Sequence, residues 1–292
     1  MNKNEAASNI EKQIISCLNI KVDNYFKHPI RLIQASKSLI GIDLKSPNSK
    51  LIEFNDYHLN SKNFDKFESI TKTSNLNEVI NIHELEEALL SKNKQKVFAI
   101  LDQLSKVSSM KHILEFLIEF CLKQKSLSCL PIWSLYRSVL FIGEKHSVDY
   151  TNLIVGMILD SHSNHSKNKL IKSSYSIYKS DISILDLQIF SNLIEMKNTN
   201  LIRHETILPL IDSFISNEIT SFKNNPKIKN LDSYDKERLW INNFINQFDK
   251  KRITIELLLF LDSIRCLLRN LDKSIHVYIY SHFERLLKKI DV

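Results

Sequence analysis

Apolar residues recur at intervals of three and four positions along most of this chain. In the stretch 97–107 they occupy Val97, Ile100, Leu101, Leu104 and Val107. An α-helix has about 3.6 residues per turn, so this spacing places all five side chains on one face. The pattern predicts an amphipathic helix whose apolar face is directed toward a protein core.

The same spacing predicts helices in other parts of the chain, and several ends carry matching signals. Ser108 or Ser109 can cap the next helix, Pro131 suits a first helical turn, and Gly143 lies just beyond the end of that helix. The stretch 275–280 has a strand-like composition, but the helical period continues through it. The predicted helical ranges are 6–18, 29–40, 97–107, 113–122, 131–140, 147–159, 182–196, 204–222, 231–248, 253–271 and 274–290.

Helices of this length with short connections predict an all-α fold with about ten or more helices. The fold is either an array of antiparallel helix hairpins or a multi-helix bundle, and the signatures of tetratricopeptide and ankyrin repeats are absent. Residues 43–49 and 62–81 are polar and poorly periodic. We therefore expect a small helical N-terminal segment with a polar linker over 1–80 and a main helical domain over 81–292.

Glycine is scarce in this sequence. Gly41, Gly143 and Gly156 are its three glycines, whereas average usage in a chain of this length would give about twenty. Phosphate-binding loops, dinucleotide turns and nucleophile elbows each need several glycines close together, because only glycine lets the backbone turn sharply against a ligand. The sequence excludes these motifs.

The chain is basic, with a formal net charge of +7 and a pI near 9.0. Such a balance would suit an acidic protein, a nucleic acid or an anionic membrane surface. The lysines are spread along the chain, however, and nearby aromatic residues fall in apolar register instead of forming an exposed stripe. Nucleic-acid binding is therefore an alternative that the pattern does not favour.

The cysteines and the apolar runs bear on the cellular compartment of the protein. Cys17, Cys121, Cys129 and Cys266 share no CxxC spacing and lie in apolar segments, so we expect buried free thiols. No apolar run reaches the length of about 18 to 20 residues that a membrane span needs, and the N-terminus lacks the apolar core of a secretory signal. We expect a cytoplasmic protein without a membrane span.

Two groups of histidine and glutamate are candidates for catalysis. His83 is followed by glutamates on a common helical face, and His112 shares a face with Glu115 and Glu119. Facing helices of a bundle could bring such groups together around a metal. The usual Glu-x-x-His signature of carboxylate-bridged di-iron bundles is absent. The catalytic candidates are therefore His83, His112, Glu115 and Glu119, without a motif behind them.

Two further groups could bind a ligand. Asp160, His162 and His165 have the residue types and spacing of a metal site, although their polar surroundings also fit a surface loop. Trp133, Tyr136 and Arg137 lie three and four positions apart and could line a pocket for a planar or acidic cofactor or ligand. The simpler interpretation is a packed helix face whose arginine reaches solvent.

These observations favour a helical scaffold or adaptor that binds another protein through a groove between helix hairpins. No cofactor is predicted for it. The alternative is an oxidoreductase with a helix-enclosed pocket of histidine and glutamate that holds a metal, a haem or an organic substrate. The alternative requires several of His28, His58, His83, His112 and His146 to share one pocket.

Overall fold

The computed structural model describes residues 1–67, 82–159, 171, 174–216, 238–249 and 252–290. Within these residues it contains thirteen α-helices and one pair of two-residue strands, so the predicted all-α class with ten or more helices is confirmed. The helices are α1 (Lys3–Leu18), α2 (Pro29–Ile40), α3 (Ser49–Ser61), α4 (Ile82–Leu90), α5 (Lys94–Val107), α6 (Met110–Lys123), α7 (Cys129–Ile142), α8 (Ser147–Leu159), α9 (Ile184–Lys197), α10 (His204–Phe214), α11 (Leu239–Asn246), α12 (Ile255–Asn270) and α13 (His276–Leu287).

Two short 3₁₀ helices and the strand pair complete the described elements. The 3₁₀ helix η1 (Tyr25–Lys27) precedes α2, and η5 (Lys273–Ile275) precedes α13. Strands β1 (Ile20–Lys21) and β2 (Asp65–Lys66) pair antiparallel with Ile20 opposite Lys66. This pair joins the chain just after α1 to the chain after α3.

The predicted ranges do not include α3, and they give no bounds for α4, although the sequence pattern places His83 and the following glutamates on a helical face. In α3 the buried positions are Leu51, Ile52, Asn55 and His58, so half of the inward face is polar and the apolar period is short. The missed signal was Asn48, whose side chain accepts a hydrogen bond from the Lys50 amide and starts the helix. In α4 the buried residues Leu85, Ala88 and Leu89 have the helical spacing of three and four, but they span little more than one turn, which is too short to mark the bounds of a helix.

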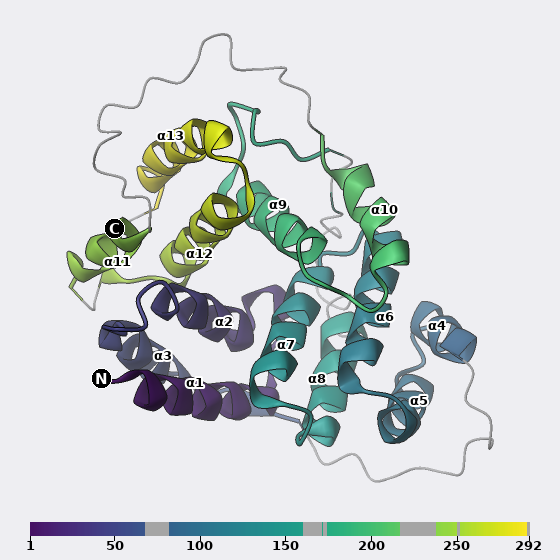
Figure 1. Cartoon of the computed structure of the whole chain (residues 1–292). Helices are drawn as coiled ribbons and strands as arrows, with labels where there is room; N and C mark the ends of the chain where they lie inside the picture. The colour runs from purple at the N-terminus through teal and green to yellow at the C-terminus, as the bar shows by residue number, and fades with distance from the viewer. Residues whose placement is uncertain (68–81, 160–170, 172–173, 217–237, 250–251, 291–292) are drawn as a thin grey trace.

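Helices α2, α7, α9 and α12 pack against one another near the middle of the molecule (Figure 1). Helices α1 and α3 pack on α2, α10 lies against α6, and α13 lies against α12. Helices α4 and α5 form a pair at the far end, where α5 contacts α8. The four central helices therefore set the geometry of whatever lies between them.

Three of the four central helices, α2, α9 and α12, begin at a side-chain cap, whereas α7 begins after Ser128 without one. His28 caps α2 by accepting from the Ile30 amide, and Pro29 occupies the first helical position. Ser183 and Asp186 form a capping box on α9, and Thr254 caps α12. These local interactions fix where α2, α9 and α12 begin.

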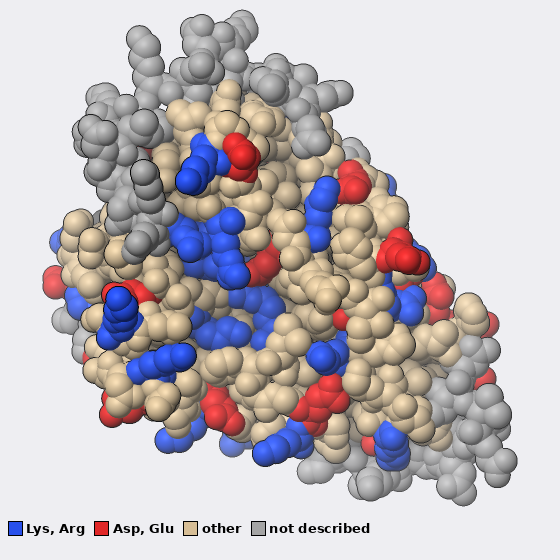
Figure 2. Space-filling view, in the orientation of Figure 1, with Lys and Arg blue, Asp and Glu red and all other residues tan. Residues whose placement is uncertain are grey.

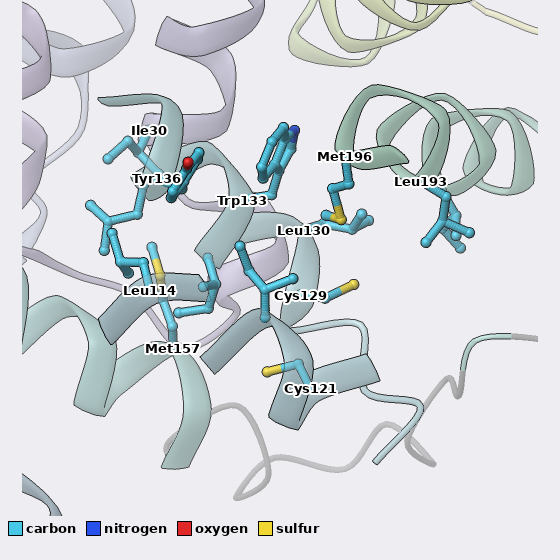
Figure 3. Packing of buried hydrophobic residues seen from close by; sticks show 14 of the residues in the cluster. Ile30, Leu114, Cys121, Cys129, Leu130, Trp133, Tyr136, Met157, Leu193 and Met196 are labelled. Atoms are coloured by element: carbon cyan, nitrogen blue, oxygen red, sulfur yellow. The ribbon is translucent and has the colours of Figure 1, made fainter. Parts of the chain in front are cut away.

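One hydrophobic cluster extends through helices on both sides of residue 80, from Ala6 to Ile290. Figure 3 shows part of it, where Trp133 and Tyr136 of α7 lie beside Leu114 of α6 and Met196 of α9. The predicted domain boundary falls in 68–81, which lies outside the described residues, and it stays a prediction. In the described part of the chain, no helix combines the length and the apolar composition needed to cross a membrane.

Candidate functional site

The central helices surround an open pocket of about 620 Å³. Its walls come from the C-terminal end of α2, from α7, from the end of α9, from the residue before α11 and from α12. Ligand sites in proteins commonly have volumes of about 300 to 1,000 Å³. The space is therefore large enough for a charged side chain of a partner or for a small molecule.

Cationic side chains dominate the lining of this space, which we call the basic pocket. Figure 2 shows lysine and arginine side chains gathered around a hollow near the centre of one face, whereas charges of both signs alternate around it. The cations that line the basic pocket are Lys37, Arg137, Arg238, Arg265 and Arg269.

Two carboxylates hold two of these arginines in place. Arg137 Nη1 lies 3.2 Å from Glu195 Oε2 and 3.8 Å from Asp262 Oδ2. Arg265 Nε donates to Asp262 Oδ1 at 2.7 Å. Trp133 Nε1 donates to Glu195 at 2.9 Å. Burial would raise the pKa of Glu195, but the charges of Arg137 and Arg265 outweigh it and lower this pKa, so Glu195 is a carboxylate at neutral pH.

Guanidinium nitrogens of Arg238, Arg265 and Arg269 in the pocket lining lack a hydrogen-bond acceptor among the described residues. The guanidinium groups of Arg238 and Arg269 form no hydrogen bond or ion pair with any residue of the described ranges, and Arg238 bonds through its backbone carbonyl, which accepts from the Ile241 amide at 3.1 Å. Arg265 Nη2 is buried without a hydrogen-bond acceptor, and the carboxylate oxygen Glu195 Oε1 lies 3.7 Å away. Arg265 Nη2 is therefore ion-paired but lacks a hydrogen bond, which is unfavourable for a buried donor, and an acceptor on a ligand would supply that bond.

Lys37 completes the basic pocket from α2. Burial, together with the neighbouring charge of Arg137, lowers the pKa of Lys37 to about 7. Its Nζ donates to the Arg137 carbonyl at 3.4 Å and lies 4.8 Å from the centre of the Phe141 ring. Phe141 and Leu140 are 41% and 52% exposed at the rim. The pocket thus combines a cationic wall with an apolar edge.

Two of the three predicted ligand-binding residues of α7 lie in this lining. Trp133 and Arg137 face the basic pocket, and Tyr136 stacks on Trp133 with 5.1 Å between ring centroids (Figure 3). The Tyr136 hydroxyl points elsewhere and donates to Glu115 at 3.0 Å. The structure therefore brings Trp133 and Arg137 together at one surface and uses Tyr136 in the core.

The predicted catalytic carboxylates Glu115 and Glu119 belong to a second polar group, which we call the carboxylate cluster. Glu115 accepts from Tyr136 and from the Arg203 amide, the latter at 2.8 Å. Glu119 is bound by the Arg203 guanidinium at 2.6 Å, Thr206 at 2.9 Å and Lys123 at 2.7 Å. These bonds join α6 to α7 and α10.

The charge state of Glu119 fits a role in joining the helices. Burial would raise the pKa of Glu119, but the hydrogen bonds from Lys123, Arg203 and Thr206 outweigh burial and lower its pKa. Glu119 is therefore held as an ion-paired carboxylate. Catalysis by Glu115 or Glu119 stays a prediction that this saturated geometry does not support.

The histidines that the oxidoreductase hypothesis needs lie on different elements and differ in burial. His28 is buried at the start of α2, where burial lowers its pKa to about 4. His58 on α3 packs edge-on to Phe64. His146, which precedes α8, lies near Asp149. His83 is exposed on α4 and His112 is exposed on α6.

The predicted metal ligands Asp160, His162 and His165 lie outside the described residues. Within the ranges that the structure does describe, no group of three His, Cys, Asp or Glu side chains is placed to hold a metal ion.

Sequence reasoning missed most members of the basic pocket. Arg265 and Arg269 lie four residues apart on α12 and share a face, but two charges on one face are also the usual pattern of the solvent side of an amphipathic helix. Lys37, Glu195 and Arg238 are distant in sequence from them and from each other. No local pattern connects residues that tertiary packing alone brings together.

No protein-family model, curated protein or solved structure matched this chain.

Proposed function

We propose that this chain is a helical adaptor that binds an acidic segment of a partner protein at the basic pocket. The observation that carries the proposal is the excess of cations over carboxylates in an open pocket between packed helices. Within the ranges that the structure describes, five cations line it, and Glu195 and Asp262 are the carboxylates that contact them. An anionic group would balance this charge and accept from donors that lack partners.

A protein segment fits the shape of the site better than a nucleic acid. Nucleic-acid surfaces extend a basic stripe along the phosphate backbone and stack bases on exposed aromatic rings. Here the cations converge on one hollow, and the surrounding face carries both signs (Figure 2). Leu140 and Phe141 at the rim offer an apolar surface to the residues that flank an acidic side chain.

A cytoplasmic location belongs to the same proposal. Cys17, Cys121, Cys129 and Cys266 are free and buried. Free thiols are usual where glutathione and thioredoxin keep cysteines reduced. Soluble acidic partners in the cytoplasm would be accessible to the basic pocket.

The proposal is tested with a fluorescein-labelled pool of degenerate peptides that has glutamate fixed at its centre. We expect saturable binding that weakens as salt rises, because ions screen exposed charges. The variant Arg269→Glu should weaken binding at least about tenfold. Lys3→Glu is the matched control, since Lys3 is exposed on α1 and does not line the basic pocket.

A labelled single-stranded oligonucleotide measured beside the peptide pool separates the two classes of partner. Binding of the oligonucleotide without binding of the peptides would contradict the proposal in favour of nucleic acid. Equal loss in Arg269→Glu and Lys3→Glu would show that net charge alone, without the basic pocket, governs binding.

A further inference from the structure

We infer that the acidic group received by the basic pocket is a phosphoryl group on the partner protein, bound as a dianion. This inference rests on the proposed function and narrows it to phosphorylated segments. Three features of the pocket distinguish a phosphate from a carboxylate: the amount of uncompensated charge, the directions from which donors approach, and the state of Lys37.

The first feature is the charge balance. Among the described residues, Lys37, Arg137, Arg238, Arg265 and Arg269 face two nearby carboxylates, which leaves three cations in excess there when Lys37 is protonated. A carboxylate supplies one negative charge, whereas a phosphate monoester carries about 1.5 to 2 at neutral pH. A phosphate therefore neutralises most of the excess, and a carboxylate would leave about two like charges opposed at short range.

The second feature is the arrangement of donors. Lys37 comes from α2, Arg137 from α7, Arg238 from the position before α11, and Arg265 and Arg269 from α12. A carboxylate has two oxygens in one plane, but a phosphoryl group has three terminal oxygens that point in different directions. Donors on separate walls of a hollow are better matched by the tetrahedral group.

The arginines also include donors that are prepared for such a ligand. Glu195 and Asp262 orient Arg137 and Arg265 from behind. Arg265 Nη2 is left buried without an acceptor. Guanidinium groups bind phosphate through paired hydrogen bonds, so fixing their planes in advance reduces the entropy lost on binding.

The third feature is a proton on Lys37. Arg137 from α7, Glu195 from α9, and Asp262 and Arg265 from α12 are the charged groups that face its amine. With a pKa of about 7, Lys37 is only partly protonated near neutral pH. A bound dianion favours the charged amine and raises its pKa, so binding should draw a proton from the buffer.

The pocket volume leaves room for more than the phosphoryl group. A space of about 620 Å³ accommodates a phosphorylated side chain together with its attachment to a peptide backbone. Leu140 and Phe141 at the rim would then contact the residues on either side. This geometry favours a phosphate presented by a polypeptide over a free phosphate ion, which would leave the apolar rim unused.

The inference is tested by calorimetric titration of the full chain with three peptide pools that share one degenerate sequence. Their central residue is phosphoserine, glutamate or serine. At about pH 7.5 we expect the phosphoserine pool to bind at least about tenfold more tightly than the glutamate pool. The serine pool should show no measurable heat.

Proton uptake provides a second readout that does not depend on affinity alone. The phosphoserine titration is repeated in two buffers that differ in ionisation enthalpy. The measured enthalpy should change with the buffer in the direction of proton uptake. The variant Lys37→Met should lose most of this dependence and still bind, because four arginines remain.

The outcomes separate this inference from the proposed function. Equal affinity for the phosphoserine and glutamate pools, both reduced by Arg269→Glu, would overturn the phosphate inference and leave an adaptor for acidic segments. Binding of inorganic phosphate with no binding of either acidic pool would overturn both. Tighter binding of the phosphoserine pool that survives Arg269→Glu would place the phosphate elsewhere and also overturn the inference.

Discussion

The basic pocket and the carboxylate cluster are built from the same kinds of side chain but differ in the balance between hydrogen-bond donors and acceptors. In the carboxylate cluster, Glu115 and Glu119 are fully provided with donors from Tyr136, Arg203, Thr206 and Lys123. In the basic pocket, donors exceed acceptors, and Arg265 Nη2 lacks an acceptor.

This difference shows how a structural group of charges can be distinguished from a binding site. Buried charges that serve only the fold are paired and hydrogen-bonded, because an unpaired buried charge lowers stability. Charged groups that line an open pocket and exceed their counter-charges can instead bind a ligand of opposite charge. Mutations should therefore affect stability at the carboxylate cluster and ligand binding at the basic pocket.

The largest expected effect is a loss of stability in Glu115→Ala. Glu115 is completely buried, and its removal leaves the Tyr136 hydroxyl and the Arg203 amide without an acceptor. We expect the free energy of unfolding in urea to fall by about 3 kcal/mol. Glu205→Ala, an exposed position on α10, is the control and should change it by less than about 0.5 kcal/mol. Equal effects would contradict the structural role of the cluster.

The next effect concerns the balance within the basic pocket. Glu195→Gln keeps an acceptor for Trp133 but removes the charge that faces Arg137 and Arg265. Since Asp262 remains, we expect a loss of about 2 kcal/mol in unfolding free energy. Sodium phosphate should restore more stability to this variant than to the wild type, relative to sodium chloride at equal ionic strength. The absence of this difference would show that anions do not enter the pocket.

A smaller effect on stability should accompany a loss of binding in Arg269→Gln. Arg269 is exposed, and its side chain has no hydrogen-bond or ion-pair partner within the described ranges. Its replacement should change the unfolding free energy by less than about 0.5 kcal/mol. Binding of the phosphoserine pool should fall by about tenfold, which corresponds to about 1.4 kcal/mol. A large loss of stability would assign Arg269 to the fold instead.

A change in free energy smaller than this loss of binding is the pH dependence of stability that comes from Lys37. Its pKa falls from 10.5 in the unfolded chain to about 7 in the folded one. Between these values the unfolded state binds more protons, so the destabilisation caused by Lys37 is complete below about pH 7 and diminishes as the pH rises toward 10.5. The free energy of unfolding of Lys37→Met should therefore exceed that of the wild type by about 1 kcal/mol near pH 6 and by less near pH 9. Urea unfolding at both pH values measures this difference.

The fold class could be predicted from the sequence because its signal is local. Apolar spacing along α5, α6, α12 and α13 records which face of each helix is buried, and that information lies within one helix. Helix α3 was missed because half of its inward face is polar, and the bounds of α4 were missed because its apolar spacing covers little more than one turn.

The basic pocket could be predicted only in part, for the opposite reason. Trp133 and Arg137 were candidates because they lie one helical turn apart, and both line the pocket. Lys37 and Glu195 join them only through the packing of α2 and α9 against α7 and α12, which no spacing within one helix records. The same packing separates His83 and His112, which the sequence presents as equivalent.

Calorimetric titration of the phosphoserine pool into Arg269→Glu and Glu115→Gln tests the contrast between the two regions most directly. Glu115→Gln retains an acceptor for Tyr136 and should bind the pool as the wild type does, whereas Arg269→Glu should lose binding by at least about tenfold. Equal binding by both variants, or loss in Glu115→Gln alone, would contradict the assignment of the basic pocket as the ligand site.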